Sequence, residues 1–117
     1  MSGQRSYLKG LAAEDAVARN YESRGATVLA RRWRGAGGEI DLILRLGADA
    51  VFVEVKASAT TDAAAQALSD RQIGRLFATA EEFLGTLPTG QLTQTRFDVA
   101  LVDSAGNVTI LENALIG

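Results

Sequence analysis

The strongest constraint on this fold is a pair of strand-like segments joined by a short turn. Residues 39–46 and 51–56 are rich in Ile, Leu, Val and Phe, and the stretch between them contains Gly47 and Ala48. A connection this short, with a glycine in it, joins two antiparallel strands in a β-hairpin. If the chain turns at Gly47 and Ala48, the register of the hairpin follows, because each residue of one strand then has one partner on the other.

The rest of the chain predicts helices and further strands on both sides of this hairpin. Helices are expected over residues 6–24 and 69–85, strands over residues 27–34, 96–102 and 108–111, and a loop over residues 57–67. Gly25 is placed to end the first helix, and Ser69 with Gln72 forms a capping-box pattern for the second. This order predicts an α/β fold, with a mixed central sheet flanked by helices, in a single domain of residues 1–117.

Four polar residues of the hairpin are expected to meet on one face of the sheet. Glu39 and Asp41 belong to its first strand, and Glu54 and Lys56 belong to its second strand. Because side chains alternate along a strand, the two members of each pair point to the same face. The register places Asp41 opposite Glu54, where Cβ atoms lie about 4.5 to 5.5 Å apart and like charges are destabilising. A neighbouring lysine relieves part of this repulsion, and a bound divalent cation would relieve more.

Apolar residues surround this cluster of charges. We expect the opposite face of the hairpin to carry Ile40, Leu42, Leu44, Val51, Val53 and Val55, and Ile43 and Phe52 to cover the acids. Carboxylates in such surroundings are costly unless they are paired or bound to a metal. The structural alternatives are that Asp41 and Glu54 are edge-strand charges that resist aggregation, and that Lys56 is only the counter-ion of Glu54.

The chain contains neither histidine nor cysteine. This excludes disulfides, Ser-His-Asp and Cys-His catalysis, and metal sites built on imidazole or thiolate. Oxygen ligands alone favour Mg²⁺ or Mn²⁺. Such an ion can activate water and neutralise charge that develops on a phosphodiester, and a lysine beside it can stabilise the pentavalent state. We therefore predict a metal site at Asp41 and Glu54, with Lys56 as its catalytic lysine.

Arginines are concentrated before the hairpin. Residues 19–34 contain five arginines and one acidic residue, and Arg31, Arg32, Trp33 and Arg34 are consecutive. Arginines beside an aromatic ring suit phosphate contact and base stacking. The alternative is a solvated strand without a binding role. The net charge of -2 and the isoelectric point near 5.1 argue against a nucleic-acid binder, which usually has a basic domain.

Two further groups of charges have structural interpretations. Arg96 and Asp98 occupy alternate positions of a predicted strand, and we interpret them as a structural pair. Glu39 has two candidate partners, Arg34 and Lys56.

Four segments carry a resemblance to a known family. They are GLAAE at 10–14, GEIDLI at 38–43, VFVEVK at 51–56 and RFDV at 96–99, and together they resemble the uncharacterised bacterial YraN family. That family is placed near the archaeal Holliday-junction resolvases, in the restriction-endonuclease-like PD-(D/E)XK superfamily. The resemblance implies an αβββαβ core and divalent-metal-dependent cleavage of the DNA backbone. It also makes a homodimer an expectation, because a Holliday junction has two-fold symmetry.

The resemblance assigns roles to individual residues as well. Asp41 and Glu54 would be metal ligands, and Lys56 would be the catalytic lysine. Glu14, a carboxylate on the core-facing row of the first helix, would correspond to the first-helix acid of the resolvases and reach the same metal. Gln72 falls where related nucleases carry a polar helix residue that faces the site.

The sequence departs from the family pattern in three places. Ala57 and Ser58 follow the E-x-K motif where the family usually has Thr and Arg, and residues 60–67 lack the usual aromatic-glycine element. Arg71 stands where the second helix usually opens with a lysine. These departures concern substrate contacts more than metal ligands, and they leave Arg71 and Gln72 as candidate nucleic-acid contacts on this helix.

Three hypotheses for the function follow. The first is a metal-dependent endonuclease that acts on branched, flapped or single-stranded DNA. The second is a catalytically inactive nucleic-acid-binding module that keeps the nuclease fold and acts with a partner, and the third is a purely structural interaction domain. Residues 1–10 lack the apolar core of a signal peptide, and no apolar run has the length of a membrane span, so we expect a cytoplasmic protein without membrane contact.

Overall fold

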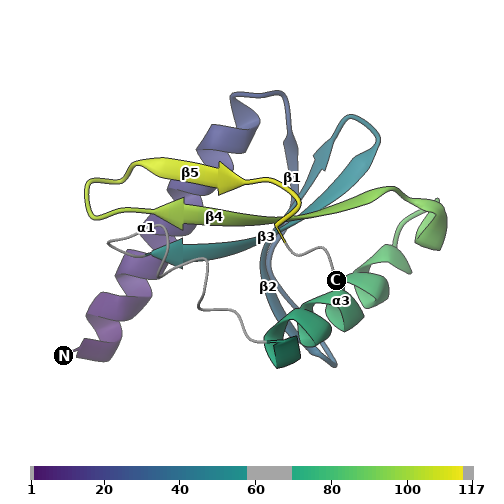
Figure 1. Ribbon diagram of the computed structural model, residues 1–117, viewed down its shortest axis with the longest axis horizontal. Helices are drawn as coiled ribbons and strands as arrows, with labels where there is room; N and C mark the ends of the chain where they lie inside the picture. The colour runs from purple at the N-terminus through teal and green to yellow at the C-terminus, as the bar shows by residue number, and fades with distance from the viewer. Residues whose placement is uncertain (1, 58–69, 115–117) are drawn as a thin grey trace.

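The computed structural model describes the backbone of residues 2–57 and 70–114 and the side chains of residues 10–57 and 70–114. Its elements are α1 (Ser2–Glu22), β1 (Thr27–Gly35), β2 (Gly38–Leu46), β3 (Asp49–Ala57), α3 (Asp70–Leu84), a 3-10 turn (Gly90–Leu92), β4 (Thr95–Val102) and β5 (Val108–Leu111). Within residues 2–57 and 70–114, the predicted order of a helix, three strands, a helix and two strands is confirmed (Figure 1). The proposed cap at Ser69 and most of the predicted loop over 57–67 lie outside the described residues.

The five strands form one mixed sheet in the order β1-β2-β3-β4-β5. Three neighbouring pairs are antiparallel, and β3 and β4 are parallel. A parallel pair needs a crossover connection, and α3 lies in the connection between β3 and β4. The α/β fold with a mixed sheet is therefore as predicted.

The two helices cover opposite faces of the sheet. On the α1 face, the buried core includes Ala13, Val17, Ala18, Tyr21, Leu42, Leu44, Val51, Val53, Ala100 and Val102. On the α3 face it includes Ile40, Ile43, Ala50, Phe52, Leu76, Ala80, Phe83, Leu84, Val99 and Leu101. Burial of these two apolar layers supplies the main favourable term in the folding free energy.

The prediction for Ile40 is wrong. Strict alternation put Ile40 on the face of Leu42, but Ile40 packs in the α3 cluster together with Ile43. The paired residues of β1, Ala30 and Trp33, also pack against that cluster, so both strands change phase between these positions. In β1, Arg32 lies within this interval and has a left-handed φ of 49°, which changes the direction of the side chains along that strand.

Helix α1 ends two residues earlier than predicted, at Glu22, and Gly25 takes the role expected of it. Its φ of 93° is readily available only to glycine. The amide of Ala26 then donates to the carbonyl of Tyr21 at 3.1 Å, as in the usual glycine termination of a helix. Among the described residues, no helix combines the length and the apolar character that crossing a membrane requires.

A buried polar network connects α1 to β4. The Asp98 carboxylate is fully buried; Arg96 donates to both of its oxygens at 2.9 Å, and the Tyr21 hydroxyl donates at 2.6 Å. The Asn113 amide adds a further hydrogen bond at 2.9 Å. Burial and the nearby Asp98 carboxylate raise the pKa of the Tyr21 phenol, so the phenol remains a donor. The structural interpretation of Arg96 and Asp98 is confirmed.

We expect Asp98→Ala to lower the free energy of unfolding by roughly 3 to 5 kcal/mol, because it removes the buried carboxylate that accepts hydrogen bonds from Tyr21, Arg96 and the Asn113 amide. Tyr21→Phe, which removes one hydrogen bond to a charged acceptor, should cost about 1 to 3 kcal/mol. Urea unfolding measures both changes. As a control, Asp15→Ala breaks the exposed ion pair with Arg31 and should cost less than about 1 kcal/mol. Equal losses for Asp98→Ala and Asp15→Ala would contradict this account of the network.

Candidate active site

The predicted hairpin register is confirmed, and the acids lie where the pairing between β2 and β3 ends. The ladder runs from Leu46 opposite Asp49 to Leu42 opposite Val53, so Asp41 and Glu54 are the next residues of the two strands. Beyond this point β3 continues its pairing with β4 as far as Ala57. Asp41 Oδ2 instead accepts a hydrogen bond of 2.8 Å from the Val55 amide, so its side chain takes a position that a backbone carbonyl would otherwise fill.

The pairing of the hairpin does not extend to residues 39 and 56. Glu39 lies opposite Arg34 of β1, and the Arg34 guanidinium donates to the Glu39 carboxylate at 3.1 Å. Lys56 lies beside Leu101 of β4, and its Nζ is 3.9 Å from Glu54 Oε1. Of the two partners considered for Glu39, the structure therefore selects Arg34.

Asp41 and Glu54 form a closely interacting carboxyl pair. Burial, the negative charge of Asp41 and a hydrogen bond between the two side chains together raise the pKa of Glu54 to about 8, while Lys56 acts in the opposite direction. A pKa in this range means that Glu54 is largely protonated at neutral pH in the absence of a ligand. This is the physical consequence of placing two like charges in a partly buried position, as the register predicted.

Glu14 is buried and paired with an arginine. It is 6% exposed; Arg32 Nε lies 3.1 Å from each of its carboxylate oxygens, and Arg32 Nη2 lies 2.9 Å from Oε2. Within residues 10–57 and 70–114, no three acidic side chains are grouped closely enough to hold one metal ion. The set of Glu14, Asp41 and Glu54 that the family resemblance implied is therefore not brought together in this structure.

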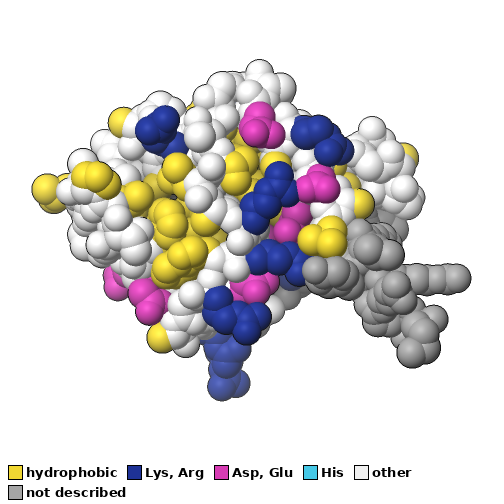
Figure 2. Space-filling model, turned by 180° about the vertical axis from the view of Figure 1, so that it is seen from behind, with side chains coloured by type: hydrophobic (Ala, Val, Ile, Leu, Met, Phe, Trp, Pro, Cys, Tyr) yellow, Lys and Arg dark blue, Asp and Glu magenta, His cyan; other side chains and the backbone are white. Residues whose placement is uncertain are grey.

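The arginines of β1 are paired with acids, and Trp33 is engaged in the core. Arg31 pairs with Asp15, Arg32 with Glu14, and Arg34 with Glu39. Figure 2 shows basic and acidic side chains interleaved on one face of the molecule. The Trp33 ring packs edge-on against Phe83, with ring centroids 5.3 Å apart. The partly buried ring therefore belongs to the packing against α3, and base stacking by Trp33 stays a prediction.

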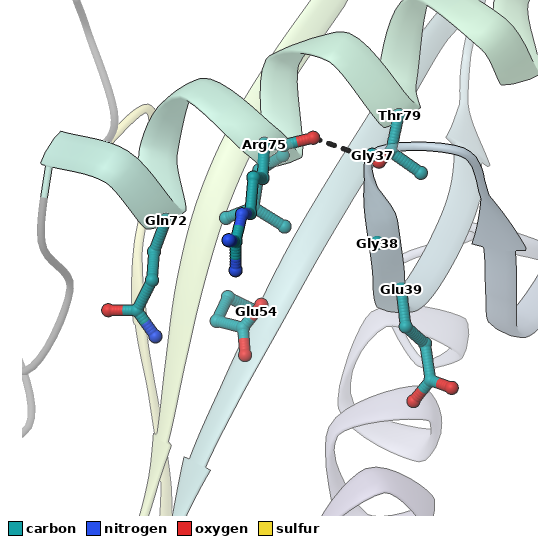
Figure 3. Close-up of a pocket in the computed structure, with 8 residues that line it drawn as sticks. Gly37, Gly38, Glu39, Glu54, Gln72, Arg75 and Thr79 are labelled. Atoms are coloured by element: carbon teal, nitrogen blue, oxygen red, sulfur yellow. Dashed lines mark hydrogen bonds between the residues drawn. The ribbon is translucent and has the colours of Figure 1, made fainter.

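A pocket of about 200 Å³ opens beside the carboxyl pair. It is lined by Gly37, Gly38, Glu39 and Glu54 from the sheet and by Gln72, Arg75, Leu76 and Thr79 from α3 (Figure 3). Gln72 thus lies at the site, as expected, whereas Arg71 is exposed and is not among the lining residues. Arg75 was missed by the sequence reasoning. Its spacing of three residues from Gln72, on the same side of a helix, is the signal that could have identified it.

Close packing of the β1–β2 turn on α3 closes one side of this pocket. A Cβ atom at Gly37 would lie 2.8 Å from Thr79 Oγ1 and 3.1 Å from the Arg75 carbonyl oxygen. The Thr79 hydroxyl donates to that same carbonyl at 2.8 Å. One residue before Gly37, the Ala36 amide donates to the Glu82 carboxylate at 2.8 Å. Only glycine permits this approach, which brings Glu39 to the rim of the pocket.

The carboxyl pair beside the pocket fits a hard divalent cation. Mg²⁺ usually keeps several waters and takes one or two protein carboxylates, and here the neighbouring Asp41 and Glu54 offer two. A cation at this position would replace the proton that Glu54 holds. Glu14 would not be needed for such a site.

The chain was compared with known proteins. The sequence model of "Uncharacterised protein family UPF0102" matches residues 13–102. A UPF0102 protein of Cereibacter sphaeroides is 58% identical over 114 residues, which cover 97% of each chain. A UPF0102 protein of Ruegeria pomeroyi is 56% identical over 112 residues, covering 96% of this chain and 91% of the relative. One of Roseobacter denitrificans is 55% identical over 114 residues, covering 97% and 88%.

The raised pKa of Glu54 predicts a pH-dependent stability of the metal-free protein. The unfolded chain loses the Glu54 proton near pH 4.5 and the folded chain near pH 8, so stability falls as the pH rises between these values. At pH 8, Glu54→Gln should therefore have a free energy of unfolding roughly 1 to 3 kcal/mol above that of the wild type, since one pKa unit is about 1.4 kcal/mol. At pH 4.5 the two proteins should differ little. Urea unfolding at both pH values measures this. Glu22→Gln, at the exposed end of α1, is the control. A difference in unfolding free energy that does not change with pH would contradict the raised pKa of Glu54.

The close approach at Gly37 gives a second prediction. Gly37→Ala should destabilise the protein by about 1 to 3 kcal/mol, because the added methyl group would overlap Thr79. Gly74 lies in α3, and a Cβ atom added there would have no neighbour within 4 Å. Gly74→Ala should therefore stabilise the protein by roughly 0.5 to 1 kcal/mol. Thermal unfolding of both variants measures this contrast, and shifts of the same sign would contradict it.

Proposed function

This chain belongs to the uncharacterised protein family UPF0102, and we propose that it hydrolyses phosphodiester bonds in DNA by using a divalent cation at Asp41 and Glu54. The observation that carries the proposal is the carboxyl pair at the end of the β2–β3 ladder, where the negative charge of Asp41 and burial raise the pKa of Glu54. A pair held in this way is costly unless a ligand compensates it. The resemblance of these strands to the restriction-endonuclease-like nucleases adds support.

Each residue of the pair has a defined part in this mechanism. The Val55 amide fixes the orientation of Asp41, and the neighbouring Glu54 side chain is largely buried. A bound Mg²⁺ or Mn²⁺ would supply Lewis acidity toward a water molecule and a phosphate oxygen. Asp41 and Glu54 would hold the ion in their charged forms, so its binding competes with protonation of Glu54. Activity should therefore rise with pH.

Lys56 acts from the same face as Glu54. Its ammonium group lies 3.9 Å from Glu54 Oε1, which is long for an ion pair. The ammonium protons are therefore available for a substrate oxygen. Positive charge at this position stabilises the negative charge that develops on the phosphate in the transition state, and it can orient the attacking water. We propose branched, flapped or single-stranded DNA as the substrate.

One observation favours the second hypothesis, a binding module without catalysis. Glu14 is held by Arg32, and the described acids form no group of three. If catalysis in this family needs a third carboxylate, the structure would serve binding alone. The two functions are distinguished by whether DNA that is bound is also cut.

We expect the purified protein to cleave labelled branched or single-stranded DNA in the presence of Mg²⁺ or Mn²⁺, and to be inactive with a chelator. Asp41→Asn and Lys56→Ala should each lower the rate by about a hundredfold or more. Asp49→Asn, at the far end of β3, is the matched control and should retain activity. Equal cleavage by the wild type and Asp41→Asn would end the proposal, and binding without cleavage by any of these proteins would favour the second hypothesis.

A further inference from the structure

Arg75 is an exposed cation on the wall of the pocket that faces the carboxyl pair. It belongs to the polar border of α3, with Gln72 three residues before it and Thr79 four residues after it. Leu76 and Phe83 anchor the adjacent side of the helix in the core. Figure 3 shows the Arg75 side chain extending from the helix toward Glu54.

No residue described by the structure compensates the charge of Arg75. Within the part of the chain that the structure describes, its guanidinium makes no ion pair or hydrogen bond, although Glu39 and Glu54 line the same pocket. The arginines of β1 differ in this respect, since each is paired with a carboxylate. An uncompensated guanidinium at the rim of a pocket retains its full capacity for an anionic ligand.

The backbone that carries Arg75 is held in place. The Thr79 hydroxyl donates to the Arg75 carbonyl oxygen at 2.8 Å, and Gly37 packs against the same carbonyl. The turn of helix that carries Arg75 is therefore fixed relative to β2, while the long side chain can still adjust to a ligand. A binding group on a rigid element is positioned more reproducibly than one on a loop.

We infer that Arg75 binds a phosphate of the nucleic-acid strand in the pocket that Glu54 also lines; the inference rests on the function proposed above. A guanidinium can donate two parallel hydrogen bonds to the non-bridging oxygens of a phosphodiester. With the carboxyl pair balanced by a divalent ion, and Glu39 balanced by Arg34, Arg75 is the cation among the described lining residues that remains to attract the strand. Arg75 is thus a substrate-binding residue, and Lys56 is the one that meets the reacting phosphate.

The test measures binding in a Glu54→Gln background, so that cleavage cannot intervene. A fluorescein-labelled single-stranded oligonucleotide is titrated at several salt concentrations with Arg75→Ala, Arg75→Lys and Arg45→Ala added to that background. Arg45 is an exposed arginine at the other end of β2, so Arg45→Ala removes the same charge outside the pocket. Arg75→Ala should weaken binding by about fivefold or more and reduce the slope of log K against log salt by about one, since one phosphate contact is lost.

Arg75→Lys should keep the salt slope and lose part of the affinity, because lysine retains the charge without the two-pronged geometry. Arg45→Ala should match its parent. An affinity and a slope for Arg75→Ala equal to those of Arg45→Ala would overturn the inference, as would the absence of binding by the Glu54→Gln parent at low salt.

Cleavage by the protein with Glu54 intact separates this inference from the proposed function. If the wild type cuts DNA, Arg75→Ala should raise KM more than it lowers kcat, and an unchanged KM would overturn the role of Arg75 while leaving the nuclease function in place. If the wild type binds DNA without cutting it, the nuclease function fails, and the salt slopes still decide whether Arg75 contacts a phosphate.

Discussion

Two carboxyl groups from neighbouring strands meet at the place where β2 and β3 stop pairing, and the architecture of the site follows from that contact. Asp41 is able to turn toward β3 because the backbone ladder has ended, and its side chain accepts the hydrogen bond of the Val55 amide. Glu54 is then held against it in partly buried surroundings, with Lys56 too distant to neutralise it fully. The protein keeps this arrangement at the expense of stability near neutral pH, which is typical of positions that a ligand completes.

The pocket beside the pair depends on how closely the β1–β2 turn approaches α3. Gly37 allows the turn to touch the backbone of the helix at Arg75, and the Ala36 amide is bound by Glu82 from the next turns of α3. As a result, residues from the hairpin and the helix face one another across a space of about 200 Å³. The same contact that stabilises the packing also brings Arg75 opposite the carboxyl pair.

Charge is distributed in a way that the net value of -2 does not convey. The acids of α1 and β2 neutralise the arginines of β1, so the arginine-rich stretch is not a free basic surface. Glu14 in particular is paired with Arg32, which donates to both of its carboxylate oxygens. It is therefore not placed as the metal ligand that the family resemblance implied. Affinity for an anionic strand would therefore depend on a few uncompensated cations at the pocket rather than on overall charge.

The sequence by itself determined the order of the elements, the hairpin register and the contact of Asp41 with Glu54. Those features depend on local period and on a short turn, and both can be read along the chain. Tertiary structure decided the rest. Ile40 and Trp33 face α3 because both strands change phase near Arg32, and the partners of the arginines come from a helix that is distant in sequence. Arg75 reaches the site only because α3 crosses the sheet at that point, and the crossing is set by packing of whole faces, which no local pattern specifies.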